Sequence, residues 1–459
     1  MCATGTPGNF SLPYGKGFNT TSSYPALKRR AIIKRPSDIF RSQIGTMDLP
    51  VESNLPMKNF EQIAELELRY LLGTYNRYPV ALARGKGVFL YDIDDRRYLD
   101  FVSGLGVNAL GHAHPRVVKT IREQAGKLIH VSNLYYHEYQ GELAEKLCTL
   151  LGASFGNARA FFSNSGTEAI EGSIKLARLA GHRAGGEAKS RLVALQGSYH
   201  GRTFGALSLT GQEKHRKGFE PLLEEVTFVG QNDIEGLRAA VNNDTCAIVL
   251  EPIFGEGGIS ECSVEFLQEC RAAADRHRAA LIFDEIQCGL GRTGTIFAFQ
   301  TFGVSPDIVA IAKPIAAGLP LGAFLAKEEF ASAISPGQHG TTFGGGPLAC
   351  RVALEFLAIV EDEKLLDNVN KVGAYLQQEL RTIVEKSAAA KEVRGRGFIQ
   401  GINLAIPARP IADEALAEGV LFNSTQDTVV RFLPPFLLEE KHVDKGIRVL
   451  KKLLRKRRK

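Results

Sequence analysis

Two apolar runs in this sequence of 459 residues each end abruptly at a charged residue. Residues 281–283 are followed by Asp284, and residues 308–312 are followed by Lys313. Pro314 disfavours the α conformation at Lys313, so we expect this lysine in an extended or turn segment. An amine in a largely buried loop has a lowered pKa and can form a Schiff base, and a desolvated carboxylate needs a cationic partner. The pair therefore indicates a site, although Lys313 taken alone could simply extend from a strand end into solvent.

Similar polar segments follow other strand-like runs in the central third of the chain. Five short apolar runs alternate with helical patterns, which predicts an α/β fold with a mostly parallel sheet flanked by helices: residues 158–162, 191–195, 246–250, 280–283 and 307–312. Ligands of such sheets bind at the carboxyl ends of the strands. The predicted pocket therefore consists of the segments that follow these runs: residues 163–167, 199–202, 251–256, 284–287 and Lys313.

Pyridoxal phosphate would use a lysine and an acid of this kind, the lysine for a covalent bond and the acid to keep the pyridine nitrogen protonated. Its phosphate needs a cradle, and residues 163–168 are a candidate because they follow a strand and open a helix over residues 169–180. Free amides and the helix dipole favour an anion there. The alternative is that Ser165 and Glu168 form a capping box, which needs no ligand. Both can hold, because a cap and a phosphate use the same unpaired amides.

Three further groups could recognise a cofactor or a substrate. Tyr199 could stack on a planar cofactor, and Arg202 could bind a carboxylate through two hydrogen bonds. The alternative is a core tyrosine beside a surface arginine. Glu256 lies in a tight Pro- and Gly-containing loop, and Arg394 lies in a Gly-flanked turn. Their spacing does not decide whether Glu256 and Arg394 meet.

Changes of pattern along the chain predict four parts: a basic leader (1–46), an N-terminal segment that joins a smaller domain (47–100), a large cofactor-binding domain (101–345) and a C-terminal α+β domain with a basic tail (346–459). Periodicity predicts helices over residues 59–70, 116–128, 348–359, 364–386 and 442–452. It predicts a hairpin over residues 87–100 and strands over residues 397–404 and 429–432.

Composition excludes several classes of function. With 44% apolar and 23% charged residues, and no apolar run of membrane-spanning length, the chain has the composition of a soluble globular protein. Residues 1–46 carry a net charge of +6 and residues 451–459 a net charge of +7, so the rest of the chain carries about −7 of the total of +6. The body is therefore acidic, and nucleic-acid binding is not indicated. The seven scattered cysteines contain no CxxC pair, which favours a reducing compartment. His112 and His114 lack further ligands at suitable spacing, so packing is favoured over a metal site.

Residues 1–46 are rich in Gly, Ser, Thr, Pro and basic residues without periodicity, which predicts disorder. They are either a dispensable or misassigned extension, with Met47 as the true start, or an organelle transit peptide. The first alternative predicts a cytoplasmic protein and the second an organelle matrix protein.

Together these segments resemble the class III pyridoxal-phosphate-dependent aminotransferases, and most closely the acetylornithine aminotransferases. The resemblance runs from about residue 69 to residue 450, and its motifs stand in this order: SGLGVNALGHAHP, FFSNSGTEAIEGSIKLAR, GSYHGRTFGALSLTG, EPIFGEGG, LIFDEIQCGLGRTG, AKPIAAGLPLGA, GTTFGGGPLAC and VRGRGFIQGINL. It implies a fold-type-I enzyme that transfers an amino group from N-acetylornithine to 2-oxoglutarate in arginine biosynthesis.

The resemblance also implies residue roles. Lys313 is expected to bind the cofactor covalently and to act as general base, while Asp284 holds the pyridinium proton and Gln287 the ring hydroxyl. The phosphate is expected to be held by Ser165, Gly166 and Thr167, and by Thr342 from the partner subunit, which implies an obligate homodimer. No metal is expected.

For the substrates, the resemblance implies that Arg202 binds the α-carboxylate of acetylornithine and Arg394 that of glutamate, with Glu256 as a switch that pairs with Arg394. The chain departs from the usual pattern at Tyr199, where Phe is common and stacking should be preserved, and at Pro314, which should only rigidify its loop. It also has Phe254 where Gln is more frequent, and this change bears on fine specificity. Ornithine or 4-aminobutyrate aminotransferases are therefore alternatives, as is a pyridoxal-dependent isomerase or racemase.

Overall fold

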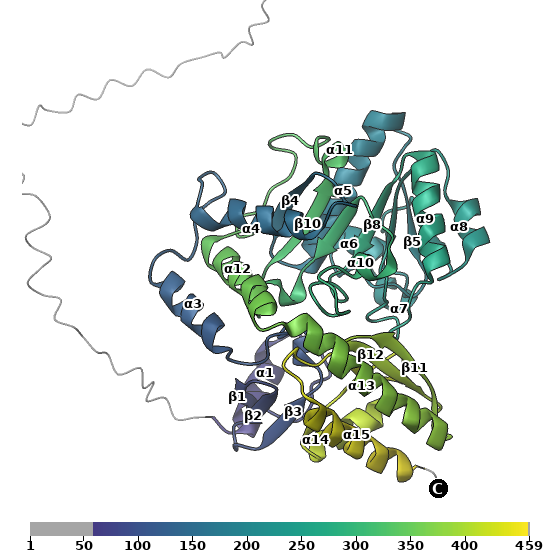
Figure 1. Cartoon of the computed structure of the whole chain (residues 1–459). Helices are drawn as coiled ribbons and strands as arrows, with labels where there is room; N and C mark the ends of the chain where they lie inside the picture. Colours follow the sequence, from purple (N-terminus) through teal and green to yellow (C-terminus); the bar gives the residue numbers. More distant parts are fainter. Residues whose placement is uncertain (1–57, 458–459) are drawn as a thin grey trace, which may run out of the picture. The chain divides into compact units, whose positions relative to one another are not determined.

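The structure, a computed structural model, describes residues 58–457 (Figure 1). The expected leader over residues 1–46, the segment 47–57 and the last two residues of the basic tail lie outside the described residues. Residues 58–457 form one unit that contains three β-sheets. Within these residues, no helix is both long and apolar enough to cross a lipid bilayer.

The largest sheet has seven strands: β4 (Ala158–Ser163), β5 (Arg191–Leu195), β6 (Val226–Val229), β7 (Thr245–Leu250), β8 (Ala280–Asp284), β9 (Ile308–Ile311) and β10 (Gly322–Lys327). Their order is β4-β10-β9-β8-β7-β5-β6. Only β10 runs antiparallel to its neighbours, so the predicted mostly parallel sheet is confirmed. The five predicted strands correspond to β4, β5, β7, β8 and β9, whereas the sequence patterns do not predict β6 or β10.

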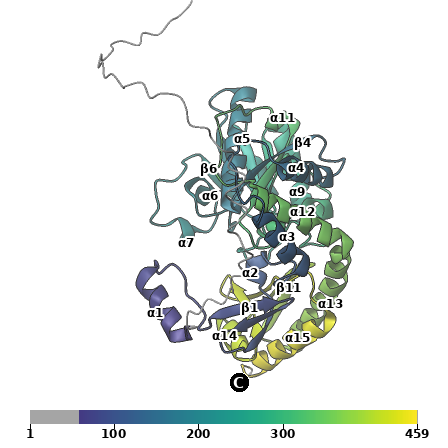
Figure 2. The same ribbon diagram turned by 90° about the vertical axis from the view of Figure 1, so that its left-hand side faces the viewer.

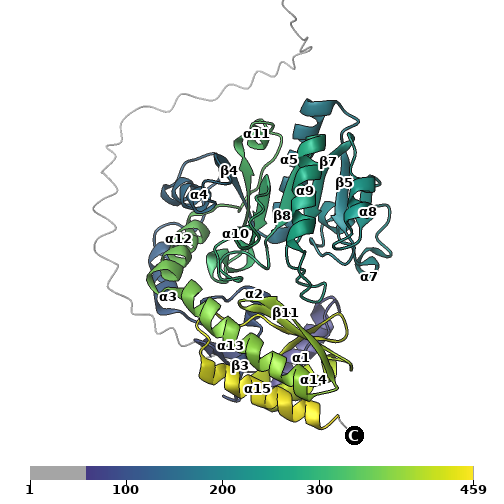
Figure 3. The same ribbon diagram turned by 45° about the vertical axis from the view of Figure 1, so that its right-hand side comes forward.

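Both faces of this sheet are covered, because successive residues of its central strands enter two separate apolar clusters. Leu192 of β5 belongs to the cluster that contains apolar residues of helix α5 (Gly166–Gly185), whereas Val193 belongs to the cluster that contains those of α9 (Val264–His277). Figure 3 shows both helices beside β5, β7 and β8. Successive side chains of a strand point to opposite faces of the sheet, and here both faces are covered. Side chains on both faces are therefore buried, which explains the continuous apolar sequences of these strands.

Two four-stranded sheets complete the β-structure. The first contains β1 (Leu82–Lys86), β2 (Phe89–Asp92), β3 (Arg97–Asp100) and β13 (Val420–Leu421); the second contains β11 (Ala390–Arg396), β12 (Ile399–Leu404), β14 (Asn423–Thr425) and β15 (Val429–Phe432). The predicted hairpin over residues 87–100 is confirmed as β2 and β3. β13 pairs in parallel with β3, with Val420 opposite Leu99. The first sheet therefore joins two segments that lie far apart in the sequence.

The helices predicted from periodicity are all present, with ends shifted by a few residues. α1 begins after Asn59, whose side chain accepts the N–H of Gln62 at 2.9 Å. Figure 2 shows α12, α13 and α15 following one another along one edge of the unit. Besides α5 and α9, the helices are α1 (Phe60–Tyr70), α2 (Ser103–Gly106), α3 (Pro115–Ala125), α4 (Glu138–Leu150), α6 (Phe204–Ser208), α7 (Glu213–Arg216), α8 (Ile234–Ala240), α10 (Ala298–Phe302), the 3₁₀ helix η2 (Lys313–Ala316), α11 (Glu328–Ala331), α12 (Pro347–Asp362), α13 (Leu365–Lys386), α14 (Arg409–Ala417) and α15 (Glu440–Arg455).

The packing role expected for His112 and His114 is observed. His112 Nε2 lies 2.7 Å from Asp100 Oδ2 at the end of β3. His114 Nε2 lies 3.2 Å from Glu363 Oε1, just beyond α12. The two histidines thus connect their loop to different carboxylates and do not converge on a common point.

Arg292, in the loop after β8, connects the large sheet to loops of both smaller sheets. Its guanidinium donates to the carbonyl oxygens of Gly106 at 3.2 Å, Phe398 at 3.4 Å and Pro434. It also lies 4.7 Å from the centre of the Phe436 ring. Arg292 is 1% exposed, and burial lowers its pKa to about 9. Three carbonyl groups therefore depend on one buried side chain.

Arg292→Met is expected to lower the free energy of unfolding by about 2–4 kcal/mol, because it leaves buried carbonyl oxygens without a donor. Urea unfolding followed by circular dichroism measures the change. Arg238→Met is the matched control: Arg238 forms surface ion pairs with Glu235 and Glu269, and its loss should leave the midpoint unchanged. Equal midpoints for wild type and Arg292→Met would contradict this role.

Candidate active site

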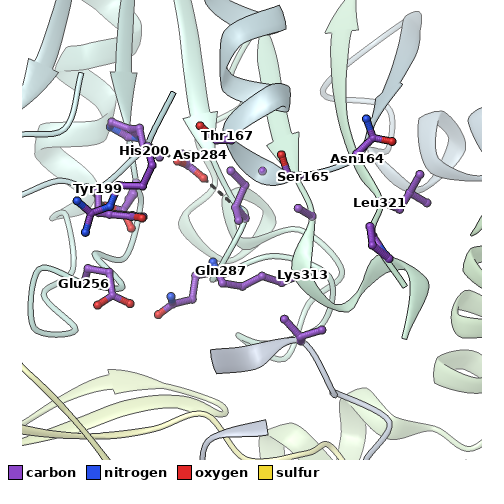
Figure 4. A pocket seen from close by; sticks show the side chains of 18 of the residues that line it. Asn164, Ser165, Thr167, Tyr199, His200, Glu256, Asp284, Gln287, Lys313 and Leu321 are labelled. Carbon is purple, nitrogen blue, oxygen red and sulfur yellow. Dashed lines mark hydrogen bonds and ion pairs between the residues drawn. The ribbon is translucent and has the colours of Figure 1, made fainter. Parts of the chain in front are cut away.

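A cavity of about 410 Å³ lies at the carboxyl ends of the strands of the large sheet (Figure 4). It is bordered by the loops that follow β4, β5, β7, β8 and β9, the edge at which a ligand is expected. Nine of the eleven predicted site residues line it: Ser165, Gly166, Thr167, Tyr199, Arg202, Glu256, Asp284, Gln287 and Lys313. The other two, Thr342 and Arg394, do not line this cavity.

Asp284 is the last residue of β8 and is 3% exposed. Its Oδ1 accepts the N–H of Ile286 at 3.0 Å, and its Oδ2 lies 2.7 Å from His200 Nδ1. His200 is buried in the loop after β5. Sequence patterns do not indicate this contact, because β7 lies between β5 and β8 in the sheet. The histidine provides the partner that a desolvated carboxylate requires and fixes the carboxylate's orientation.

Lys313 is the first residue of η2, and its φ is 44°. The chain therefore turns at Lys313, and of the two expected conformations it is the turn that occurs. Burial lowers the pKa of Lys313 from its ordinary value, and the charges of Asp284 and Glu256 oppose the shift. A lowered pKa increases the fraction of free amine near neutral pH, and both nucleophilic and base chemistry need the free amine.

Helix α5 begins at Gly166, in the wall of the cavity. Ser165 Oγ accepts the N–H of Glu168 at 3.4 Å, but the Glu168 carboxylate accepts the N–H of Asn164 at 2.6 Å and not that of Ser165. The reciprocal capping box considered above therefore forms only in part. The amides of Gly166 and Thr167 belong to the first turn and have no partner inside the helix, so they are suited to bind an anion.

The loop after β5 packs closely on this helix end. Gly201 has φ 143°, and a Cβ atom there would lie 2.1 Å from Thr167 Oγ1, so no other residue fits without rearrangement. Thr203 Oγ1 lies 2.8 Å from the same oxygen. This approach brings Tyr199 and Arg202 to the cavity, with the guanidinium carbon of Arg202 5.6 Å from the centre of the Tyr199 ring. Arg202 is exposed and can receive an anion.

Glu251, which follows β7, joins the loops on either side of the cavity. Its Oε1 accepts the N–H of Tyr199 at 2.8 Å, and its Oε2 accepts the N–H of Gly255 at 2.9 Å. Burial raises the pKa of Glu251 to about 7, and the charge of Asp284 adds to the shift. One buried carboxyl group thus sets the position of the aromatic wall relative to the loop that carries Glu256.

The arginine that meets Glu256 is Arg431 of β15. Arg431 Nη1 donates to Glu256 Oε1 at 2.6 Å and to Gln287 Oε1 at 3.3 Å. The side chain of Arg431 is 1% exposed and that of Glu256 is 31% exposed. Burial by itself would raise the pKa of Glu256, but the charge of Arg431 and its hydrogen bond lower the pKa below the ordinary value. Arg431 does not itself line the cavity, but it is bonded to Glu256 and Gln287, which do. A second guanidinium therefore lies next to the cavity wall and is paired with an ionised glutamate.

The expected pairing of Glu256 with Arg394 is wrong for this structure. Arg394 Nε donates to Glu392 Oε1 at 2.8 Å, and Arg394 Nη1 donates to the carbonyl oxygen of Gly258 at 3.2 Å. Glu392 stands two residues earlier on the same strand, so both side chains project from the same face. The sequence did contain a feature from which the role of Arg431 could have been inferred. An arginine inside a strand that is otherwise apolar requires a buried acceptor.

Thr342 is exposed, and its expected contact with the phosphate site of a partner subunit stays a prediction. Its neighbour Thr341 makes the local contacts. Thr341 Oγ1 accepts from Asn164 Nδ2 at 3.2 Å and from the N–H of Gly344 at 3.1 Å. Thr342 is thereby held at the surface near the start of α5.

Comparisons with known proteins agree with this geometry. Residues 73–454 match the family described as aminotransferase class-III. The acetylornithine aminotransferase of Methanocaldococcus jannaschii is 45% identical over 390 residues, which cover 85% of this chain and 97% of that protein. The ornithine aminotransferase structure from Toxoplasma gondii ME49 has a TM-score of 0.83 at 29% identity and covers 88% of this chain and 97% of its own. The acetylornithine aminotransferase structure from Elizabethkingia anophelis has a TM-score of 0.77 at 30% identity, with 87% and 100% covered.

Lys313 is expected to react with acetic anhydride at lower pH than exposed lysines do, because a lowered pKa leaves more of the amine unprotonated at a given pH. Mass spectrometry of protein freed of small ligands, acetylated across a pH series, measures this. Lys371, whose side chain is 75% exposed, serves as the internal reference. Half-maximal modification of Lys313 at the same pH as Lys371, or above it, would contradict the assigned direction.

Proposed function

The chain belongs to the class-III aminotransferases, and on that basis we propose that it transfers the distal amino group of N2-acetylornithine to 2-oxoglutarate. The products are N-acetylglutamate 5-semialdehyde and glutamate, and the reaction belongs to arginine biosynthesis. Pyridoxal phosphate is the proposed cofactor.

One observation supports the choice of substrates: Arg202 lines the cavity and is open, whereas a second arginine, Arg431, lies next to the cavity wall and is paired with Glu256, which lines it. N-Acetylornithine has a single carboxylate, which Arg202 can bind so that the distal amine faces Lys313. The carbon that carries its distal amine has no carboxylate, so Arg431 needs Glu256 to remain paired. Glutamate and 2-oxoglutarate have two carboxylates, and the second can replace Glu256 on Arg431. One pocket thus accepts both substrates.

The residues present fit pyridoxal phosphate. The cavity has the volume of a small-ligand site, a helix start with two unpaired amides suits the phosphate, and a buried carboxylate suits a protonated ring nitrogen. When bound, the cofactor supplies an electron sink for the carbon that exchanges the amino group. The groups that would hold it are Ser165, Gly166 and Thr167 at the phosphate, Asp284 at the ring nitrogen, Gln287 at the ring hydroxyl, Tyr199 on the ring face and Lys313 at the aldehyde carbon.

Lys313 is the proposed general base. Its Nζ takes a proton from the amine-bearing carbon and returns it during transfer, for which burial prepares it by lowering its pKa. Asp284, held by His200 and by the N–H of Ile286, keeps its carboxylate in one orientation. Glu251 binds the N–H of Tyr199 and the N–H of Gly255, so it keeps a constant distance between Tyr199 and the loop of Glu256. The ring face and the carboxylate-binding site therefore keep their relative positions.

Ornithine aminotransferase is the second candidate, because the ornithine aminotransferase of Toxoplasma gondii has a similar structure. Phe254, a buried residue of the loop that carries Glu256, stands where the family more often has Gln, so the preferred amine is to be measured directly. An amino-group isomerase or racemase would use the same lysine and acid but would not consume 2-oxoglutarate.

A homodimer is part of the proposal. Exposed apolar side chains gather beside the loop of Thr342: the exposed fractions are 86% for Leu134, 105% for Tyr136 and 67% for Phe343. Asn133 Nδ2 joins the two segments by donating to the carbonyl oxygen of Thr341 at 3.2 Å. Exposed apolar groups of this size mark association surfaces. On such a surface, Thr342 can reach the phosphate site of the partner subunit.

The kcat/KM for N-acetylornithine is expected to exceed those for ornithine and 4-aminobutyrate by about tenfold or more, because relatives named acetylornithine aminotransferase are 44–45% identical to this chain over most of its length. Steady-state assays of the holoenzyme with 2-oxoglutarate provide the comparison. A preference for free ornithine would replace the proposed substrate. Turnover of an amine without any keto acid would replace the reaction class with isomerisation or racemisation.

Mixing two inactive variants is expected to restore activity. In hybrids of Lys313→Ala and Thr342→Asp subunits, one of the two sites has an intact lysine and receives an intact threonine from its partner. Random exchange should therefore recover about a quarter of wild-type activity, since about half of the dimers are hybrids with one good site. If Thr342 served its own subunit, the mixture would stay inactive. Light scattering of each variant checks that both still form dimers.

A further inference from the structure

Asn423 lies on β14 directly opposite Arg431 on β15. Its Oδ1 accepts hydrogen bonds from Arg431 Nε at 2.9 Å and from Arg431 Nη2 at 2.5 Å. The third nitrogen, Nη1, donates to Glu256 Oε1 and to the carbonyl oxygen of Gly255 at 3.0 Å. The buried guanidinium therefore has a neutral side-chain acceptor on one side and an ionised one on the other.

We propose that Asn423 is a specificity-determining residue that positions Arg431 without neutralising it, so that Glu256 alone controls whether a substrate carboxylate can bind. This role rests on the function proposed above, in which the second carboxylate of glutamate or 2-oxoglutarate replaces Glu256.

The chemistry of the position favours an amide. An aspartate at residue 423 would stay on the guanidinium after Glu256 leaves, and its charge would compete with that of the substrate. An apolar residue would leave two N–H donors of buried Arg431 without an acceptor. Asn423 supplies the acceptor and leaves the positive charge available.

The same hairpin holds the main chain of Glu256. Thr425 Oγ1 and Gln426 Nε2 both donate to the carbonyl oxygen of Glu256, at 2.9 Å and 2.8 Å. Gln426 has φ 47°, a left-handed turn conformation typical of tight hairpins, which define strand register. A shift by one residue would move Asn423 to the opposite face of the sheet. The hairpin thus fixes the backbone of Glu256, and the exchange of carboxylates requires movement of its side chain only.

Asn423→Asp, which keeps the shape and adds a charge, tests the proposal in the holoenzyme. The KM values for glutamate and 2-oxoglutarate are expected to rise about ten- to a hundredfold, because a charge-assisted bond to the second carboxylate is weakened. The KM for N-acetylornithine and the kcat of its half-reaction should change less than about twofold, since Arg202 binds its only carboxylate. An equal rise for both types of substrate, or none, overturns the proposal.

Asn423→Ser separates a charge effect from a structural one. Serine keeps a neutral acceptor but is smaller, so the proposal expects its KM for glutamate to stay closer to wild type than that of Asn423→Asp. A purely structural role predicts the reverse order and would overturn the proposal. Asn403→Asp is the matched control: it adds the same charge to β12 of the same sheet, where Asn403 contacts Glu392 and Thr428, and both KM values should stay unchanged.

Arg431→Gln distinguishes failure of this inference from failure of the function on which it rests. If Arg431→Gln leaves the KM for glutamate unchanged, the second carboxylate site itself is wrong. If Arg431→Gln raises that KM and Asn423→Asp does not, only the role of Asn423 is wrong. Thermal unfolding of each holoenzyme variant shows whether it is folded under the assay conditions.

Discussion

Desolvation of charged groups at the carboxyl edge of the large sheet is the constraint on which the rest of the site depends. The central strands are apolar on both faces, so the first charged groups after them lose water: Asp284 and Glu251 are buried, and Lys313 is half-buried. Such groups need partners within the protein. The loop after β5 supplies a partner to each carboxylate: His200 binds Asp284, and the N–H of Tyr199 binds Glu251. Strand order therefore decides which loops can complete the site.

The parts of the fold that could be predicted are those with a local cause. β7 and β8 are continuous apolar runs, so both strands could be predicted. Asp284 at the end of β8 and Lys313 after β9 could be recognised as site residues, because no neighbour in the sequence pairs with either charge. β10 (Gly322–Lys327) could not be recognised in the same way. It follows a Gly- and Pro-containing loop and enters the sheet antiparallel, between β4 and β9, so the rhythm of alternating strands and helices does not apply to it.

The parts of the site that could not be predicted are contacts between segments far apart in the chain. His200 and Asp284 are 84 residues apart, and Glu256 and Arg431 are 175 apart. The Gly-flanked turn around Arg394 indicated a bend in the chain but contained no information on distance to Glu256. The composition of β15 was more informative. An arginine among Val and Phe, in a strand that is buried throughout, has to meet an anion. Burial of a charge is thus a better guide to a partner than proximity to a turn.

The proposed exchange of partners on Arg431 follows from the same electrostatics. Leaving a buried charge unpaired costs about 3–5 kcal/mol, so a carboxylate can leave Arg431 only when another takes its place. The carbon that carries the distal amine of N-acetylornithine has no carboxylate to offer, so with this substrate Glu256 remains bound. A dicarboxylate can, and partial exposure of Glu256 allows the released side chain to regain water. Asn423 holds the guanidinium throughout, so what changes between the two states is the origin of one carboxylate, while the charge balance inside the protein stays the same.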